Sequence, residues 1–294
     1  TKDSFDVAYQ KVILDVLDNN YANLQLYDKQ IEVREEKREL GITENIAFYD
    51  IYSNLGLYRE AWQQYAQEVK PTIADNDSYG LAKYHTKMGN YLRLDDSAPT
   101  ALKELNKAKG YLNVYLNDVS IQNSESDIFE AELLKARIDG GIAKCHVELG
   151  EYETAIPLLE ESIEVLKTSA SNADQSEVVE NSLFLAEANL QEDAFSKAKT
   201  ILDQEFDNIN VFQTIKRNSL LAAYYDKIES YKNAAAYYKR NERIEDSLAE
   251  KQSTIIKQQL VTIVANKNLE NSQRLIDEQK RINELARSEM KAKD

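Results

Sequence analysis

Apolar residues recur along this chain mostly three or four positions apart, as on one face of a helix, and rarely in strict alternation. The last glycine or proline is Pro157, so the second half lacks residues on which tight hairpin turns depend. The pattern therefore predicts an all-α fold. Two helices are expected within residues 4–40, where the apolar series are Phe5, Val12, Leu14 and Leu17, then Tyr21, Leu24, Tyr27, Ile31 and Leu40.

A short motif recurs downstream of these two helices. An aromatic residue stands three positions before an alanine, and a large apolar residue follows that alanine by four. The motif occurs as Tyr58-Ala61-Tyr65, Tyr152-Ala155-Leu159, Phe195-Ala198-Leu202 and Tyr231-Ala234-Tyr238. A fifth copy lacks the aromatic residue but keeps Ala101 and Leu105, with Gly89 before them. Recurrence at this scale predicts a helical repeat architecture.

The motif resembles the tetratricopeptide repeat, a helix-turn-helix unit of about 34 residues. The resemblance implies a right-handed helical solenoid in which each alanine lies where two antiparallel helices cross closely. Gly56 and Gly150 are expected to end the first helix of their units in a left-handed conformation, which glycine tolerates. Asp193 and Glu229 occupy the matching positions in two other copies and depart from the glycine pattern.

Three regions follow from this register. Residues 1–41 are predicted to form N-terminal capping helices, residues 42–248 five repeat units, and residues 249–294 a long C-terminal helix. The C-terminal region carries a seven-residue column, but its companion column is mostly polar, which indicates only a weak coiled coil. Packing on the last repeat and weak homodimerisation both remain open. The column is Leu248, Ile255, Thr262, Leu269, Ile276, Asn283 and Met290.

Composition and charge narrow the classes of function. The net charge of −15 opposes binding to nucleic acid. Cys145 has no second cysteine to pair with, and His85 and His146 are too few for a convincing metal cluster. No glycine-rich phosphate loop or catalytic triad signature occurs, and no apolar run is long enough to span a membrane. We therefore expect no enzymatic activity, no cofactor and no metal.

The flanks of the repeats carry a second resemblance. Leu17-Asp18-Asn19-Asn20-Tyr21 and the segment from Tyr237 to Leu248 look like the corresponding parts of bacterial membrane-anchored tetratricopeptide-repeat regulators and sensor kinases. The resemblance implies a ligand-sensing module on the periplasmic side, anchored only through a further segment downstream of this chain. The alternative is a cytoplasmic interaction scaffold or a peptide-pheromone receptor.

A candidate binding site follows from the tetratricopeptide register. The family's concave groove is lined by the first helix of each unit, and it implies a protein or an extended peptide as the partner. Arg93, Lys144 and Asn90 suggest a locally basic, amide-bearing groove that could hold a carboxylate or a peptide backbone, although hydrated side chains on a free helix face are the simpler reading. The candidate ligand-binding residues are Asp50, Thr86, Asn90, Arg93, Lys144 and Glu187.

Overall fold

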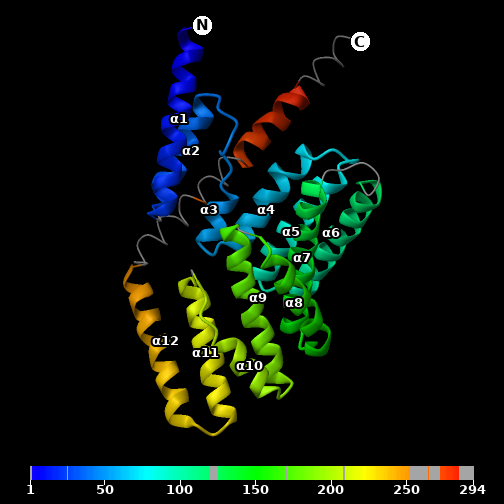
Figure 1. Ribbon diagram of the computed structural model, residues 1–294. Coiled ribbons are helices and arrows are strands. Elements are labelled where there is room, and N and C mark those ends of the chain that lie inside the picture. Colours follow the sequence, from blue (N-terminus) through cyan, green and yellow to red (C-terminus); the bar gives the residue numbers. More distant parts are fainter. Residues whose placement is uncertain are drawn as a thin grey trace. The chain divides into compact units, whose positions relative to one another are not determined.

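The computed structural model describes residues 2–24, 26–119, 125–169, 171–207, 209–251, 264 and 272–284. Throughout these ranges the regular structure is helical, without a β-strand (Figure 1). Two compact units are present, residues 1–241 and 242–294. The helices are α1 (Lys2–Asn23), α2 (Tyr27–Glu39), α3 (Tyr49–Asn54), α4 (Tyr58–Glu68), the 3₁₀ turn η1 (Lys70–Thr72), α5 (Ser78–Leu94), α6 (Ala98–Val119), α7 (Glu125–Glu148), α8 (Tyr152–Leu166), α9 (Asn172–Gln191), α10 (Phe195–Leu202), α11 (Val211–Lys227) and α12 (Tyr231–Lys251).

Short turns join the helices into pairs, and five of these turns share one geometry. In each, a residue five positions before the motif alanine has a positive φ, and the next residue donates its N–H to a carbonyl five positions back. This is the hydrogen bond of a Schellman motif, which satisfies a carbonyl at the end of the first helix. The five residues are Gly56, Asp96, Gly150, Asp193 and Glu229, with φ of 74°, 56°, 79°, 54° and 60°.

The turn expected at Gly56 and Gly150 is therefore confirmed. Asp193 and Glu229 adopt the same left-handed conformation without being glycine, so these copies keep the turn although they depart from the glycine pattern. Asp96 supplies the equivalent turn in the copy that lacks an aromatic residue. The left-handed region strains residues with a Cβ atom, so the hydrogen bonding of the turn must outweigh that cost in three copies.

The motif alanines lie at buried helix crossings. Ala61, Ala101, Ala155 and Ala198 have no exposed surface, and Ala234 is 1% exposed. Gly89 shows how closely the helices approach, because a Cβ atom built on it would lie 2.6 Å from Leu105 Cγ. The large apolar residue four positions later is buried in four copies. In the last copy, Tyr238 is instead exposed and donates a hydrogen bond to Asp226.

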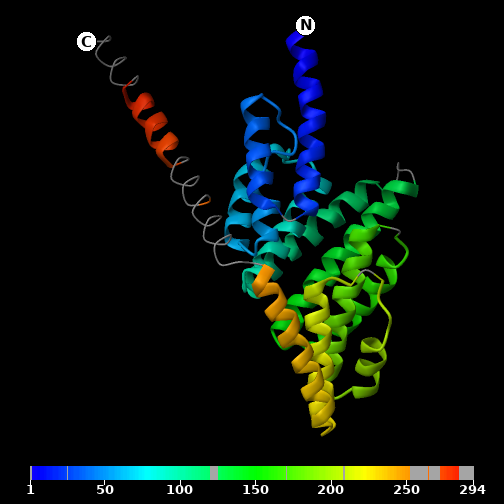
Figure 2. The same cartoon turned by 90° about the vertical axis from the view of Figure 1, so that its left-hand side faces the viewer.

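The odd-numbered helices contact one another as well as their own partners. α7 and α9 each touch the odd-numbered helix before and after them, and each also packs against neighbouring even-numbered helices (Figures 1 and 2). Apolar side chains of the two sets form the core between them, with Leu105, Leu159 and Leu183 fully buried. One consequence is that side chains of α5, α7, α9 and α11 meet on a common surface.

Successive motif alanines stand further apart than the about 34 residues of a tetratricopeptide repeat, and long helices account for part of the difference. α6 has 22 residues and α7 has 24. The polar residues 75–77 form the loop before α5, and α9 begins at Asn172 within the polar residues 169–176. The prolines fit the helical register: Pro71 lies in the 3₁₀ turn after α4, and Pro99 in the first turn of α6.

The C-terminal region is described only in part. α12 runs to Lys251 without a break at the boundary drawn after residue 248, and residues 272–284 are helical. Most of the seven-residue column, including Ile255, Thr262 and Leu269, lies outside the described residues. The weak coiled coil and the homodimer remain predictions.

The predicted helical pair at the N-terminus is present as α1 and α2. Leu14, Val33 and Ile42 form its buried core. Val12, which the sequence grouped with Leu14, points away from this core and is 60% exposed. The two residues are only two positions apart, so on a helix they lie on different faces.

Candidate binding surface on the odd-numbered helices

Three odd-numbered helices are joined by a cluster of ion pairs around Glu180 of α9. Arg93 of α5 donates to Glu180 Oε1 at 2.9 Å, and Lys144 of α7 donates to Glu180 Oε2 at 2.9 Å. Arg93 also donates to Glu148 Oε1 at 2.8 Å, and Lys144 to Glu177 Oε1 at 3.3 Å. Residues far apart in sequence are thereby tied into one polar site.

The cations of this cluster are buried, while the carboxylates face solvent. The side chains of Arg93 and Lys144 are 7% and 2% exposed, against 31% for Glu148, 33% for Glu180 and 19% for Glu177. Long basic side chains can bury their aliphatic stems and still reach a partner with the charged end. The acidic side chains of the cluster are therefore more exposed than its cations, in contrast to the basic patch suggested by the sequence.

Electrostatics hold Glu180 in its charged form. Burial raises the pKa of the carboxyl, but the nearby charges of Lys144 and Arg93 outweigh that effect and lower its pKa to about 2. Two hydrogen bonds from the same cations act in the same direction. Glu180 thus stays ionised at neutral pH.

The surface continues onto α11 through Phe184 and Glu187. Lys216 of α11 lies 3.4 Å from the centre of the Phe184 ring and pairs with Glu187 at 2.8 Å. The guanidinium carbon of Arg93 lies 5.4 Å from the same ring. Contacts of a cation with an aromatic face add to the ion pairs, so Phe184 links the two groups of charges.

Two polar groups of α5 have no hydrogen-bond partner among the described residues. The buried Oδ1 of Asn90 is an acceptor, and the buried Nε of Arg93, one turn further on, is a donor. Asn90 faces α7 at Gly141, whose added Cβ atom would lie 3.4 Å from Asn90 Oδ1. Thr86 is satisfied within its own helix, since its hydroxyl donates to the Ala82 carbonyl at 2.7 Å.

Lys87, also on α5, stands among tyrosine rings. Its Nζ lies 4.6 Å from the ring centre of Tyr49, 5.3 Å from that of Tyr65 and 5.7 Å from that of Tyr91. Burial lowers the pKa of Lys87 below its ordinary value, against the opposite effect of nearby Asp50. The aromatic faces stabilise the ammonium where water is partly excluded.

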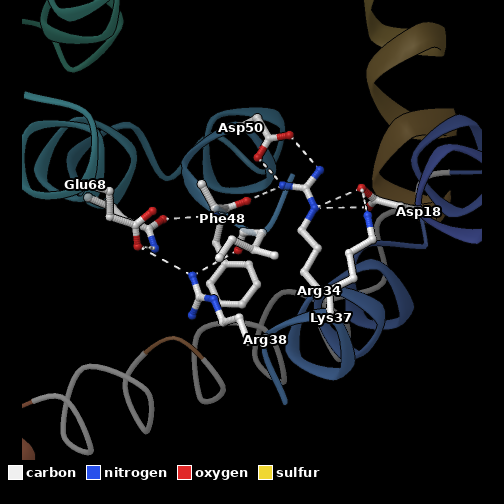
Figure 3. Close-up of polar contacts among 10 residues, drawn as sticks. Asp18, Arg34, Lys37, Arg38, Phe48, Asp50 and Glu68 are labelled. Carbon is white, nitrogen blue, oxygen red and sulfur yellow. Dashed lines mark hydrogen bonds and ion pairs between the residues drawn. The ribbon is translucent and has the colours of Figure 1, made fainter. Parts of the chain in front are cut away.

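Asp50 belongs to a different cluster, which ties α1 and α2 to α3 (Figure 3). Arg34 of α2 donates to both oxygens of Asp50, at 2.5 and 2.8 Å, and to both oxygens of Asp18, at 3.0 and 3.2 Å. Lys37 is fully buried and pairs with Asp15 at 2.8 Å and with Asp18 at 3.5 Å. Through these contacts Asp50 links α3 to the helix pair α1 and α2.

The same region contains a second arginine. Arg38 lies 4.4 Å from the centre of the Phe48 ring, donates to the Ile46 carbonyl at 2.9 Å and approaches Glu68 at 3.5 Å (Figure 3). The Phe48 side chain is buried in the core, with 1% of its surface exposed. Arg34 and Arg38 together anchor the segment that leads from the first helix pair into α3.

The structure thus brings together some of the predicted site residues. Arg93 and Lys144 share Glu180, Asn90 lies one turn from Arg93, and Glu187 lies one turn after Phe184. Asp50 and Thr86 are engaged elsewhere. The sequence reasoning missed Glu148, Glu177, Glu180, Phe184 and Lys216. A signal did exist, because the residue 18 positions before the motif alanine is charged in four copies: Lys83, Arg137, Glu180 and Lys216.

Other reactive side chains are engaged in the fold. Cys145 has no exposed surface, and burial raises the pKa of its thiol to about 11, so it is a neutral core residue. His146 pairs with Glu151, and His85 pairs with Glu104 at 2.7 Å. In the described ranges, no group of three or more His, Cys, Asp or Glu side chains is placed to hold a metal ion. Nor does any described helix combine the length and apolarity of a membrane span.

These features define an all-α protein built from successive helix pairs, with a polar surface on the first helices of the pairs. No family model matches the chain, and no curated protein matches it in sequence. Among solved structures, the chain is similar to BtubC (BKLC) from P. vanneervenii. The two share 15% sequence identity and a TM-score of 0.41 over 84% of this chain and 92% of that one.

Proposed function

We propose that this protein is a tetratricopeptide-like, right-handed helical solenoid that binds a protein or an extended peptide on the surface of its odd-numbered helices. Five copies of the left-handed turn and of the buried alanine support the repeat assignment. Contacts along the series α5, α7, α9 and α11 support an extended surface of the kind that such repeats use for recognition.

The proposed partner is basic. The observation that carries this choice is that Arg93 and Lys144 are buried while Glu148, Glu177 and Glu180 stay partly exposed, so three carboxylates outnumber two cations in this cluster. A Lys- or Arg-containing segment can pair with these carboxylates, and the net charge of −15 raises its rate of association. An acidic ligand, which the sequence had suggested, would meet like charge.

The N–H and carbonyl groups of a peptide backbone can pair with two unpartnered polar atoms of α5. The unpartnered Oδ1 of Asn90 can accept from a peptide N–H, and the unpartnered Nε of Arg93 can donate to a peptide carbonyl. Both groups are buried, so a small shift of the side chains would have to accompany binding. Unpaired buried polar groups are costly, which favours a ligand that satisfies them.

We propose a ligand-sensing role in a membrane-anchored bacterial regulator as the context, with the repeats on the periplasmic side. The resemblance at Leu17–Tyr21 and Tyr237–Leu248 supports it. A cytoplasmic scaffold or a peptide-pheromone receptor is the alternative. The gene sequence beyond both ends of this chain distinguishes them: an export signal before it and an apolar span after it favour the sensor.

The binding surface is tested with a fluorescent library of extended 12-residue peptides, one half rich in Lys and Arg and the other rich in Asp and Glu. Basic peptides should bind, and Glu148→Gln with Glu187→Gln should weaken binding at least fivefold. The matched control is Glu153→Gln with Glu160→Gln on α8, which removes the same charge from exposed positions of an even-numbered helix. Preference for acidic peptides, or equal weakening by both double variants, would contradict the proposal.

A further inference from the structure

A hollow of about 610 Å³ lies where the end of α8, the first half of α9 and the segment after α10 meet. We call it the α9 pocket. Its volume falls within the range of about 300–1,000 Å³ that is usual for sites that bind small molecules. Such sites combine a mainly apolar lining with a few polar groups that orient the ligand, and the α9 pocket has both parts.

Hydrogen bonds hold the wall of the α9 pocket that follows α10. Arg217 of α11 donates to the Leu202 carbonyl at 2.8 and 2.6 Å and to the Gln204 carbonyl at 2.9 Å. The guanidinium carbon of Arg217 also lies 5.6 Å from the centre of the Phe206 ring. On the opposite side, Gln175 of α9 donates to the Ser169 carbonyl at 2.7 Å. The pocket therefore has walls that are fixed by contacts within the protein.

The apolar part of the lining consists of Val178, Val179 and Phe206. The two valines are adjacent in sequence and belong to different cores, Val178 to the core with α7 and α8, and Val179 to the core with α10 and α11. Phe206 is half-buried and packs against the second of these cores. An apolar group of a ligand would be removed from water by contact with these three side chains.

The polar part of the lining carries charges of both signs. Lys167, which ends α8, supplies an ammonium group, and Glu205 and Asp207 supply two carboxylates. Among the described residues none of these three side chains forms an ion pair or a hydrogen bond. By contrast, Asp203 does not line the pocket and pairs with Lys199 at 2.5 Å. The charged groups of the α9 pocket thus remain open to a ligand.

We propose that the α9 pocket binds a free α-amino acid with a large apolar side chain. Lys167 pairs with the carboxylate of the ligand, Glu205 and Asp207 attract its ammonium group, and the apolar side chain contacts Val178, Val179 and Phe206. None of these residues belongs to the ion pairs around Glu180, so the inference is independent of the function proposed above.

The charges of the lining argue against other classes of small molecule. An apolar amine would leave Lys167 without a partner, and an apolar carboxylic acid would bring a like charge to Glu205 and Asp207. A neutral sugar would pair with none of the three charges and would place hydroxyl groups against the valines. An amino acid with an apolar side chain matches both signs of charge and the apolar part of the lining.

The first test compares four ligands on the full chain by isothermal titration calorimetry. L-Phenylalanine should bind with a dissociation constant on the order of 0.1–1 mM, as expected for a ligand of this size. Phenethylamine lacks the carboxylate and 3-phenylpropionate lacks the ammonium group, and each should bind at least fivefold more weakly. Glycine, which has both charged groups without an apolar side chain, should not bind measurably.

The second test assigns each charge of the ligand to its partner. Lys167→Gln should weaken binding of L-phenylalanine at least fivefold and should not weaken binding of phenethylamine. Glu205→Gln with Asp207→Asn should weaken L-phenylalanine and strengthen 3-phenylpropionate, because a like charge is removed. The matched control is Lys197→Gln, an exposed lysine of α10 that does not line the pocket, and it should leave every affinity unchanged.

The substituted side chains are exposed, and circular dichroism verifies that the variants are folded. The comparison of ligands on the wild-type chain needs no variant, so a folding defect would not remove the test. Absence of L-phenylalanine binding up to about 10 mM would overturn the proposal. So would equal affinity for L-phenylalanine and phenethylamine, or equal weakening by Lys167→Gln and Lys197→Gln.

Discussion

At the scale of single residues, Glu180 has the most consequential position. It accepts hydrogen bonds from both Arg93 of α5 and Lys144 of α7. The other two carboxylates of the cluster each accept from one of these cations. Removing it leaves two buried cations with less compensation, and uncompensated buried charge is strongly destabilising. The fold therefore depends on the ionised form of one partly exposed carboxylate.

This dependence predicts an acid-sensitive contribution to stability. The pKa of Glu180 is lowered from 4.5 to about 2, so its contribution is complete above about pH 4.5 and is lost as the pH falls through about 2. Glu180→Gln should unfold at lower denaturant concentration than wild type at pH 7, and the difference should shrink on acidification. Urea titrations between about pH 2 and pH 7 measure it.

The control for this prediction is Glu153→Gln, an exposed carboxylate of α8. The urea midpoint of this variant should equal that of wild type at every pH, because the substitution leaves the ion pairs around Glu180 unchanged. A constant gap between Glu180→Gln and wild type at every pH would show that the carboxylate charge does not carry the effect.

Gly89 and Gly110 give a second test at the residue scale. A Cβ atom at Gly89 would lie 2.6 Å from Leu105 Cγ, whereas one at Gly110 would meet nothing within 4 Å. Gly89→Ala should cost about 1–3 kcal/mol through overpacking. Gly110→Ala should stabilise by about 0.5–1 kcal/mol, because alanine is the better helix former. Denaturant unfolding compares the two, and a neutral Gly89→Ala would argue against the close crossing of α5 and α6.

At the scale of elements, the left-handed turn is the feature that the repeat units share. A residue with a Cβ atom pays about 1–2 kcal/mol in this region, and glycine avoids that cost. Glycine also raises the conformational entropy of the unfolded chain, which offsets part of the stability gained by avoiding the strain. The glycine pattern in the sequence therefore understates the number of turns, because hydrogen bonding holds Asp96, Asp193 and Glu229 in the same shape.

A glycine in the turn between α11 and α12 should consequently stabilise the protein. Glu229→Gly is expected to raise the free energy of unfolding by up to about 1 kcal/mol, and Gly150→Ala to lower it by about 1 kcal/mol. Thermal unfolding of the two variants measures both effects. A destabilised Glu229→Gly would mean that the glutamate side chain contributes more to the turn than its backbone costs.

Helix existence could be predicted from the sequence, but the assignment of faces could not. The apolar series of residues 4–40 correctly gave two helices, yet Val12 and Leu14 lie on opposite sides of α1. Two apolar rows on one helix blur the periodicity on which such an assignment depends. The start of α7 was hidden for another reason, because the polar residues 125–127 lack the apolar spacing of a helix and yet begin one.

At the scale of the whole molecule, the sequence indicated which helices carry the candidate site residues but not which of their charges are buried. The repeat register correctly placed Arg93 and Lys144 on neighbouring first helices. It could not reveal that Glu148 and Glu180, from other positions of the register, would lie over them. Which end of an ion pair is buried depends on packing depth, and a list of residue types does not contain that information.

The net charge of the chain also bears on the charge of its surface. A value of −15 suggested an acidic surface. Among the described residues the four buried Lys and Arg side chains are nearly matched by the buried carboxylates of Asp18, Asp139 and Asp174, so burial leaves that excess of acidic groups almost unchanged. The partner proposed for the surface of the odd-numbered helices is basic for this reason. Screening by salt should therefore weaken this interaction.

The contacts between helices also bear on how this chain reaches its fold. Every extensive contact among the described helices joins elements no more than two apart in order, so most partners are close along the chain. Low contact order reduces the loop-closure entropy that must be lost before contacts form, and it is associated with fast folding. A growing chain can thus complete one helix pair against the previous one while later residues are still being synthesised, leaving few long unpaired stretches open to aggregation.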